Sequence, residues 1–534
     1  MAHGLRAWTF RSRLYDLSLS LGRGDGAAPS WAPDDLWQGQ VINDIGVALD
    51  GNIEPRSYWS IPADGSRREY LERHRFSGFS NTTTEPAQLR QMAAVWLANF
   101  DRWHADVWRL DILGDRLNHW LIHNHALTDG ADDDFVRLWR RALRRQARHL
   151  LRWAHKSRPG DDPLPAVQGA IMAALAFPEY SDRLKIYLAV LTTEIERHIN
   201  ADGGHAGRSP ARHLDFLARL ITIRTALNGA HTSIPQDIQG AIDRMTPMLR
   251  AYRHGDHGLA LFNGSRHAAP EFIDRVLELS GSRSRAAASA PHTGFYRLSA
   301  QRTALIVDAG TPVDGTSDAY GHAGTLSFEM SIGKQRLIVN CGTGSLREPM
   351  LCDALRATAA HSTLTIGNTH SSDLFANGRF GQRKPRNIQT RRRELERNIL
   401  VESSHDGYLD VFGLIHWRSL YLSAEGSDVR GEDAIESGGT KPPSRELRNP
   451  PYTLRFHLHP DVDASLTTAG NTVLLRLASG QGWRFHTEGG KLSLEESVYC
   501  AEGGRQKTEQ IVVSGIHQAP RTMIKWRISR EARA

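Results

Sequence analysis

The chain has 534 residues, in which 66 Lys and Arg outnumber 59 Asp and Glu for a formal net charge of +7. Apolar residues make up 40% and charged residues 23%, a composition that excludes a disordered chain. Three cysteines without CxxC spacing exclude a disulfide framework and argue against a cysteine zinc site. The mild positive charge favours an acidic ligand but does not by itself indicate nucleic acid.

The first half of the chain has the apolar period of helices. Apolar residues recur every three or four positions, and short loops rich in Gly, Pro, Ser and Asp separate the stretches. This order predicts stacked helical hairpins, as an open solenoid or a closed α/α toroid, and we favour the toroid. The predicted helices cover residues 87–108, 135–155, 164–177, 183–198, 211–227 and 235–252.

The apolar period changes to two beyond a small, polar stretch at residues 280–291, which we interpret as a linker. Alternating apolar residues at 326–332 predict a half-buried strand, followed by a hairpin turn and a return strand at 336–341. We interpret residues 426–451, rich in Gly, Ser, Glu and Arg, as a long surface loop. Further strands are predicted at 303–308, 362–366, 473–477, 491–494 and 510–513.

These patterns predict a multidomain α+β protein, with an N-terminal α/α toroid followed by a C-terminal antiparallel β-sandwich. We divide the chain into an N-terminal extension with the first toroid elements (1–85), the toroid (86–280), a linker (281–292) and the sandwich (293–534).

Several segments resemble the heparinase II/III-like family. The resemblance is carried in the β half by YGHAGTLSFEM (320–330), RLIVNCGTGS (336–345) and RATAAHSTLTI (356–366), then by residues 405–418 and 431–433. In the helical half, residues 202–205 and 254–264 are similar. The resemblance covers roughly residues 90–525. It implies the same toroid and sandwich, and polysaccharide lyase chemistry on uronic-acid-containing chains.

Lyases of this kind cleave by β-elimination. A cation or an amide neutralises the uronate carboxylate, a base removes the C5 proton, and an acid protonates the leaving oxygen. We expect this chemistry in a cleft between the two domains, because such clefts accommodate long chains.

The resemblance implies catalytic roles for His205, Arg208, Arg212 and Tyr320. The family has His where this chain has Tyr320, and Tyr where it has Arg212 or His213. Tyr320 can act as a base beside cations, or it packs at the domain interface. Arg212 suits bidentate binding of a carboxylate, or it is a surface residue of a first helical turn.

Four further residues are candidates for substrate binding. Asn124 and His125 form the kind of pair that grips a uronate in relatives, although so short a pair also occurs by chance. Asp256 and Asn263 lie in a Gly-punctuated loop expected to line the cleft, and the alternative is simple turn chemistry.

A possible structural zinc site is implied at His322, Asn340 and His361. The family has Asp at the position of Asn340, and a neutral amide is a poorer zinc ligand than a carboxylate. The alternative is a hydrogen-bonded cluster without metal. We expect no organic cofactor.

A stripe of arginines shares one face of a predicted helix. We interpret it as a solvated outer face or as a surface that steers an anionic polysaccharide. The stripe consists of Arg137, Arg141, Arg144, Arg148 and Arg152.

The predicted function is β-elimination on an acidic polysaccharide or oligosaccharide. The alternative is a catalytically impaired acidic-glycan-binding or envelope-assembly protein of the same fold. A glycoside hydrolase would need paired carboxylates, for which Asp202, Asp256 and Glu329 are available. The expected partner is an acidic glycan and not nucleic acid. Since no signal peptide and no apolar run of 18 residues is recognisable, we expect a cytoplasmic protein, with the periplasm or cell envelope as the alternative.

Overall fold

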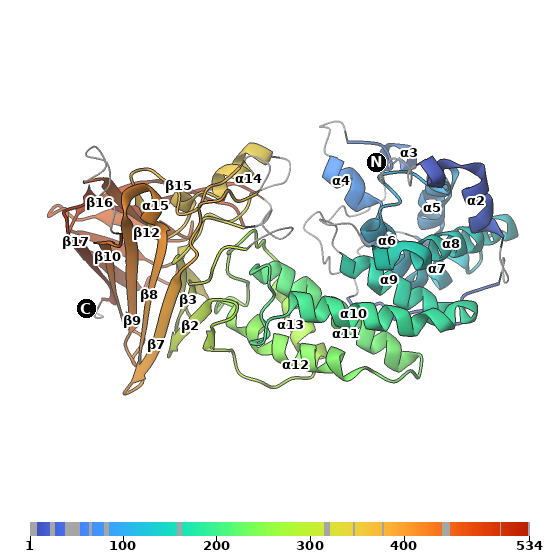
Figure 1. The fold of residues 1–534 in the computed structure, drawn as a ribbon, viewed down its shortest axis with the longest axis horizontal. Helices are drawn as coiled ribbons and strands as arrows, with labels where there is room; N and C mark the ends of the chain where they lie inside the picture. Colours follow the sequence, from blue (N-terminus) through green and yellow to red (C-terminus); the bar gives the residue numbers. More distant parts are fainter. Residues whose placement is uncertain are drawn as a thin grey trace. The chain divides into compact units, whose positions relative to one another are not determined.

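A computed structural model describes most of the chain (Figure 1). The described residues are 8–21, 27–37, 54–62, 67–79, 85–156, 163–313, 321–344, 348–375, 379–439, 449–501 and 504–531. They form a helical N-terminal region followed by C-terminal antiparallel β-sheets, as predicted. No helix among them combines the length and the apolar character needed to cross a membrane.

The helical region consists of α-helices joined by short 3₁₀ turns. The helices are α2 (Arg13–Ser20), α3 (Pro55–Tyr58), α4 (Arg67–Arg73), α5 (Pro86–Phe100), α6 (Leu110–Ile122), α7 (Asn124–Thr128), α8 (Asp133–Trp153), α9 (Pro163–Ala176), α10 (Leu184–His198), α11 (Pro210–Gly229), α12 (Gln236–Ala251) and α13 (Pro270–Ser280). The 3₁₀ turns are η1 (Ser77–Phe79), η2 (Ala154–Lys156) and η3 (Pro178–Arg183).

The single helix predicted at residues 87–108 is wrong, because the chain there forms α5 and the start of a connection to α6. The indole of Trp108 donates a hydrogen bond of 2.9 Å to the carbonyl of Phe100 at the end of α5. This bond satisfies one of the carbonyls that a helix end leaves without a partner. The apolar residues beyond Phe100 therefore cap the helix rather than continue it.

The C-terminal region contains two sheets whose described strands pair antiparallel throughout. The first sheet has the order β1-β2-β3-β4-β5-β11-β16-β15, with β6 beside β11. The second has the order β12-β13-β14-β17-β10-β9-β8-β7. The strands are β1 (Ser289–Ala290), β2 (Phe295–Ala300), β3 (Thr303–Asp308), β4 (Phe328–Ile332), β5 (Gln335–Val339), β6 (Leu364–Ile366), β7 (Ile388–Leu395), β8 (Asn398–Tyr408), β9 (Leu414–Leu422), β10 (Asp428–Ser437), β11 (Pro451–Leu458), β12 (Asp463–Leu466), β13 (Thr472–Arg476), β14 (Gly482–Glu488), β15 (Lys491–Tyr499), β16 (Gln506–Ile516) and β17 (Arg521–Arg530). Short helices α14 (Pro349–Leu355) and α15 (Leu409–Phe412) and the 3₁₀ turn η5 (Thr358–Ala360) connect them.

One apolar core joins the two sheets. The ring of Phe328 on β4 stacks on Trp526 of β17 with centroids 5.7 Å apart, and Phe456 on β11 contacts Phe485 of β14 at 4.8 Å. The core cluster draws buried residues from nearly every strand of both sheets. Aromatic pairs of this kind contribute beyond the area that they bury.

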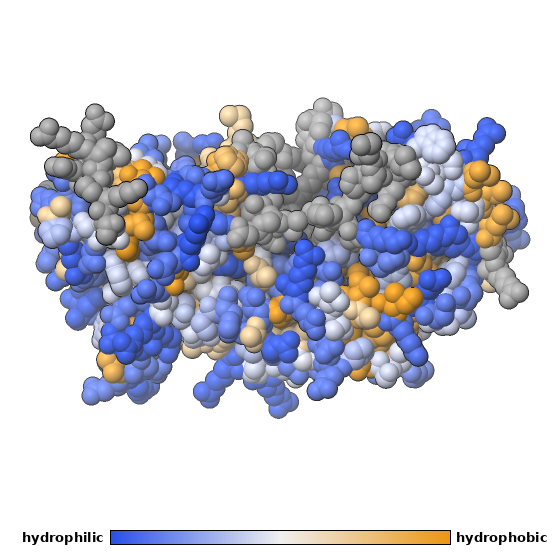
Figure 2. Space-filling view, viewed as in Figure 1, coloured by the Kyte–Doolittle hydropathy of each residue, from blue (hydrophilic) through white to orange (hydrophobic). Residues whose placement is uncertain are grey.

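The described chain divides into two compact units. The first contains residues Met1–Arg197 and Asp215–Ile242, and the second contains His198–Leu214 and Asp243–Ala534. Helices α11 and α12 contribute residues to both. Figure 2 shows mostly hydrophilic residues on the face in view, with apolar residues in separate small groups.

The arginine stripe on α8 is only partly exposed to solvent, so the interpretation of the whole stripe as a solvated outer face is wrong. Arg144 is buried and pairs with Glu179, while Arg148 donates to the carbonyl of Leu19 at 2.6 Å and to the hydroxyl of Tyr180 at 2.8 Å. Arg152 donates to the Ser18 carbonyl at 3.0 Å. The stripe therefore anchors helix α2, and its N-terminal end at Arg137 remains exposed.

The surface loop predicted at residues 426–451 is wrong for its first part, which forms β10 between β9 and β17. Its buried carboxylate, Asp433, accepts hydrogen bonds from Arg418 at 2.8 Å, His416 at 2.7 Å and Trp526 at 2.9 Å. Burial alone would raise the pKa of Asp433, but the charges and hydrogen bonds of Arg418 and His416 lower it to about 2. A polar stretch of sequence can therefore form a central strand, because the charge of Asp433 is hydrogen-bonded by residues of the neighbouring strands β9 and β17.

We expect Asp433→Asn to lower the free energy of unfolding by about 3–5 kcal/mol, because it leaves the Arg418 charge buried without a counter-charge. Chemical denaturation followed by circular dichroism measures the loss. The control is Asp463→Asn in the same sheet, where an exposed ion pair with Arg476 has an N–O distance of 2.8 Å and contributes less than about 1 kcal/mol. Equal losses in the two variants would contradict the role of the buried network.

Candidate functional site

Most of the predicted site residues lie in the second unit, on loops beside the first sheet. They come from the loop ahead of α11, the loop between α12 and α13, the segment before β4 and the turn before β6. Tyr320 lies outside the described residues, so its predicted catalytic role stays a prediction.

Arg208 is anchored inside the protein. Its Nε donates to the carbonyl of Thr293 at 2.8 Å, one terminal nitrogen donates to the carbonyl of Thr311 at 2.9 Å, and the other pairs with Asp308. Its guanidinium also lies over the ring of Phe295, 5.3 Å from the centroid. Since all three nitrogens have protein partners, the side chain acts as a bridge between the α11 loop and the first sheet.

Asn263 completes this bridge. Its amide nitrogen donates to the carbonyl of Arg208 and to the Asp308 carboxylate, each at 3.1 Å, and its oxygen accepts from the backbone of His322 at 3.2 Å. The backbone of Asn263 has a φ of 48°, a left-handed conformation that Asn adopts more readily than most residues. The structure therefore brings together Arg208, Asn263 and His322 around Asp308, a residue that the sequence analysis did not single out.

His205, in the loop ahead of α11, lies close to Arg212 in the first turn of that helix. His205 is buried, and its Nδ1 accepts a hydrogen bond of 2.9 Å from the backbone of Gly207, which places its proton on Nε2. Burial, and then the charge of Arg212, hold the pKa of His205 well below its usual value. The imidazole is therefore neutral, beside a partly exposed guanidinium.

His322 and His361 are both buried, with Nδ1 of the first 3.0 Å from Nε2 of the second. Because Nδ1 of His361 lies 2.8 Å from the carbonyl of Ala357, it carries the proton and its Nε2 accepts from His322. Burial, and then the neighbouring His361, hold the pKa of His322 well below its usual value.

Asn340 does not complete a zinc site with this pair. Its amide nitrogen donates to Glu329 at 3.2 Å, and its oxygen accepts from the backbone of Ser362 at 3.0 Å. No group of three or more His, Cys, Asp or Glu that could hold a metal occurs within the described part of the chain. The residues present therefore do not fit the zinc implied by the resemblance, because Asn340 is committed elsewhere and zinc needs a further strong ligand.

Glu329 is a fully buried carboxylate on β4. It accepts from Nε2 of His254 at 2.9 Å, from the backbone of Leu261 at 3.1 Å and from the backbone of Asn340 at 3.1 Å. Burial lowers the pKa of His254 although the hydrogen bond to Glu329 opposes it. From the sequence Glu329 was a candidate only as a hydrolase carboxylate, because its partners come from two distant segments, the α12–α13 loop and the residue after β5.

Asp256 forms an ion pair with Arg336 at 2.7 Å. Burial alone would raise the pKa of Asp256, but the charge and hydrogen bond of Arg336 lower it to about 2. Asp256 therefore stays ionised and holds the α12–α13 loop to β5, and its predicted contact with substrate stays a prediction.

The pair Asn124-His125 lies in the first unit, at the start of α7. The amide oxygen of Asn124 accepts from the indole of Trp139 at 3.1 Å, and His125 is exposed. Asn124 thus helps to position α8, and the predicted grip on a uronate stays a prediction.

The first unit also contains a buried charged cluster that the sequence analysis missed. Asp115 on α6 pairs with Arg219 and with Arg75, each at 2.6 Å, and Arg219 donates to Gln168 at 3.0 Å. Burial alone would raise the pKa of Asp115, but the two arginines lower it to about 2. Charged residues at core-facing positions of α6 could have indicated this cluster from the sequence, because charged side chains are rarely buried without a partner.

Two family models match almost all of this architecture. The heparinase II/III N-terminus model matches residues 90–280, and the heparinase II/III-like C-terminal model matches residues 282–527. The chain belongs to the heparinase II/III-like family. A curated relative, FtsZ-localized protein C of Caulobacter vibrioides, is 28% identical over 99% of this chain and 94% of its own length.

Solved structures of this heparinase family share the fold. A heparinase III crystal structure matches 96% of this chain and 88% of its own, with a TM-score of 0.73 and 13% identity. Heparan sulfate lyase HepC from Pedobacter heparinus matches 97% of this chain and 86% of its own, with a TM-score of 0.60 and 17% identity.

We expect Asn340→Asp to lower the free energy of unfolding by about 2–4 kcal/mol, because it removes a hydrogen bond to Glu329 and places a second carboxylate beside it. Thermal unfolding with and without zinc measures the effect, and Asn124→Asp is a partly exposed control. Stabilisation of the wild-type protein by zinc would contradict the misfit, since Asn340 would then complete a site with His322 and His361.

We expect the free energy of unfolding to fall as the pH drops below about 6.5, which is the usual pKa of a histidine side chain. Burial lowers the pKa of His213 to about 4 and those of His457 and His149 to about 3. The unfolded chain therefore takes up protons between about pH 6.5 and these values while the folded chain does not. Melting temperatures between pH 7.5 and 5 test this. His457→Gln should make the melting temperature depend less steeply on pH, whereas the exposed control His125→Gln should leave the slope unchanged. A wild-type melting temperature that does not change with pH would contradict this prediction.

Proposed function

We propose that the protein is a polysaccharide lyase-like protein that acts on a uronic-acid-containing acidic polysaccharide by β-elimination. The observation that carries this is family membership across both the helical region and the β-sheets. Its structural neighbours include heparinase III and a heparan sulfate lyase. The net charge of +7 is compatible with an anionic chain.

The pair His205 and Arg212 best supplies the chemistry in the described residues. The partly exposed guanidinium of Arg212 suits a uronate carboxylate, which must be neutralised before the C5 proton becomes acidic. His205 is buried and its imidazole is neutral, so it places no second positive charge beside the guanidinium of Arg212. The proton acceptor assigned by resemblance, Tyr320, completes the proposal.

If this proposal holds, wild-type protein forms unsaturated uronate product, detected by ultraviolet absorbance, from at least one of heparan sulfate, hyaluronan, alginate and polygalacturonate. Arg212→Ala should then lower kcat/KM about 10²-fold, because the developing carbanion loses its counter-charge. Arg137→Ala, an exposed arginine on α8, should leave it unchanged. No product from any of these polymers would count against the lyase.

A second candidate is a protein of the same fold that binds an acidic glycan without cleaving it and takes part in envelope assembly. Arg208 and Asn263 favour it, because their polar groups are bound inside the protein. The relative named FtsZ-localized protein C also favours it. Saturable glycan binding without product, together with co-sedimentation with FtsZ polymers, would select this candidate.

A further inference from the structure

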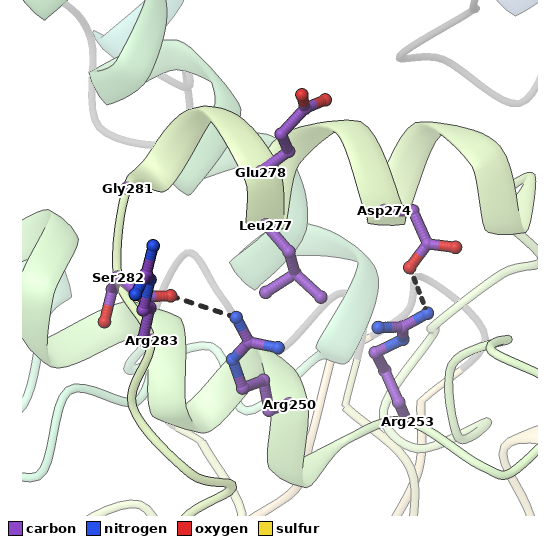
Figure 3. Close-up of a pocket in the computed structure, with 8 residues that line it drawn as sticks. All are labelled: Arg250, Arg253, Asp274, Leu277, Glu278, Gly281, Ser282 and Arg283. Atoms are coloured by element: carbon purple, nitrogen blue, oxygen red, sulfur yellow. Dashed lines mark hydrogen bonds and ion pairs between the residues drawn. The ribbon is translucent and has the colours of Figure 1, made fainter.

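Five arginines line a groove in the second unit, and Figure 3 shows three of them, Arg250, Arg253 and Arg283. It runs between the end of α12, α13 and the segment 281–286, and consists of two adjoining cavities of about 480 and 410 Å³ that share Arg250 and Arg253. Arg283 lines the first cavity, while Arg285 and Arg297 line the second. We call this the arginine groove. His205, Arg208 and Arg212, the residues predicted for catalysis that the structure describes, do not line it.

The arginine groove has an excess of positive charge. Its lining holds two carboxylates, those of Asp274 and Glu278, against the five arginines. Asp274 is bound by Arg253 at 2.6 Å and His257 at 3.1 Å, and Glu278 pairs at 2.8 Å with Arg275, which lies outside the lining. Four arginines of the groove therefore have no carboxylate partner among the described residues.

Two of these four arginines, Arg250 and Arg297, are held in place by backbone carbonyls, which do not neutralise their charge. Arg250 donates to the carbonyl of Ser282 at 3.0 Å, as the close-up shows, and its buried Nε has no hydrogen-bond partner in the described residues (Figure 3). Arg297 donates to the carbonyls of Ala251 at 3.0 Å and Arg253 at 2.7 Å. Burial, and then the charge of Arg253, lower the pKa of Arg297 to about 10, so an anion in the groove would relieve the crowding of like charges.

The segment 281–286 adds a regular spacing of charge. Its residues alternate between exposed and partly buried, and Arg283 and Arg285 are both exposed. Residues two apart in an extended chain lie on the same side, about 6.6 Å from each other. Arginines so arranged can bind successive anionic groups of one polymer through paired N–H donors.

The remaining lining favours a charged polymer over a protein partner. Among the described residues that line it, Leu277 is the only large apolar side chain, and none is Phe, Tyr or Trp. Protein interfaces depend on aromatic and apolar anchors at their centres and exclude charge from them. A ligand of the arginine groove has to be recognised by its anionic groups.

We propose that the arginine groove binds a polyanionic carbohydrate that carries carboxylate or sulfate groups, as a contact separate from the predicted reaction residues. This inference rests on the proposed function for its class of ligand, and it adds where the chain of that ligand is held. Binding there raises the local concentration of the polymer without taking part in bond cleavage.

The test uses the full-length protein and labelled oligosaccharides of heparan sulfate and polygalacturonate. Binding by fluorescence anisotropy is compared for wild type, for R283E/R285E and for R391E/R505E. The last variant carries the same charge change at exposed arginines outside the groove. Circular dichroism and melting temperature check that each variant folds.

We expect R283E/R285E to weaken binding of at least one oligosaccharide about tenfold or more, while the control changes it less than about twofold. Equal loss in both variants would show that net charge alone attracts the polymer and would overturn the proposal. Equally tight binding of polyglutamate or polyuridylate to wild type would also overturn it, by assigning the groove to an acidic peptide or to RNA.

The same samples separate this inference from the proposed function. Groove-dependent binding without unsaturated product would leave the groove assigned and reject the lyase. Product formation with binding and KM unchanged in R283E/R285E would support the lyase and reject the groove.

Discussion

The carboxylate of Asp308, at the end of β3, holds together the segments on which the candidate site is built. It pairs with Arg208 from the loop ahead of α11 and accepts a hydrogen bond from Asn263 of the α12–α13 loop. Asn263 in turn binds the backbone of His322. A charge so deeply buried is tolerated only when it is paired and hydrogen-bonded, and removing one partner is costly. The positions of three loops therefore depend on one anion.

The same requirement recurs in both units and divides the arginines of the chain into two classes. Asp115 in the helical region and Asp433 in the second sheet each hold an arginine within 2.8 Å. Arginines bound in this way stabilise the fold and have few donors left for a ligand. In the arginine groove Arg253 pairs with Asp274, while the other four arginines have no carboxylate partner in the described residues, so their charge is left for an anion from outside.

Family membership and catalytic activity are separate matters for this chain. The heparinase fold is shared at 13–17% identity, a level at which a backbone persists while site residues change. Arg212 or His213 stands where relatives by resemblance carry Tyr, Asn340 stands where they carry Asp, and each change alters what the position can do. A guanidinium binds a carboxylate but does not shuttle a proton, and an amide donates to Glu329 where a carboxylate would repel it. Function has to be argued from such residues, since one fold hosts many activities.

Local pattern determined much of the architecture. The strand predicted at 303–308 coincides with β3, because a short apolar run bounded by polar residues needs no distant partner to be recognised. The family, too, was predictable from contiguous motifs. Only the tertiary structure determines which groups each buried charged side chain pairs with. Arg208 and Asp308 are 100 residues apart, and Arg148 and Leu19 are 129 apart. Sequence periodicity does not reveal such pairs, so β10, the partners of the α8 stripe and the arginine groove were found only in the fold.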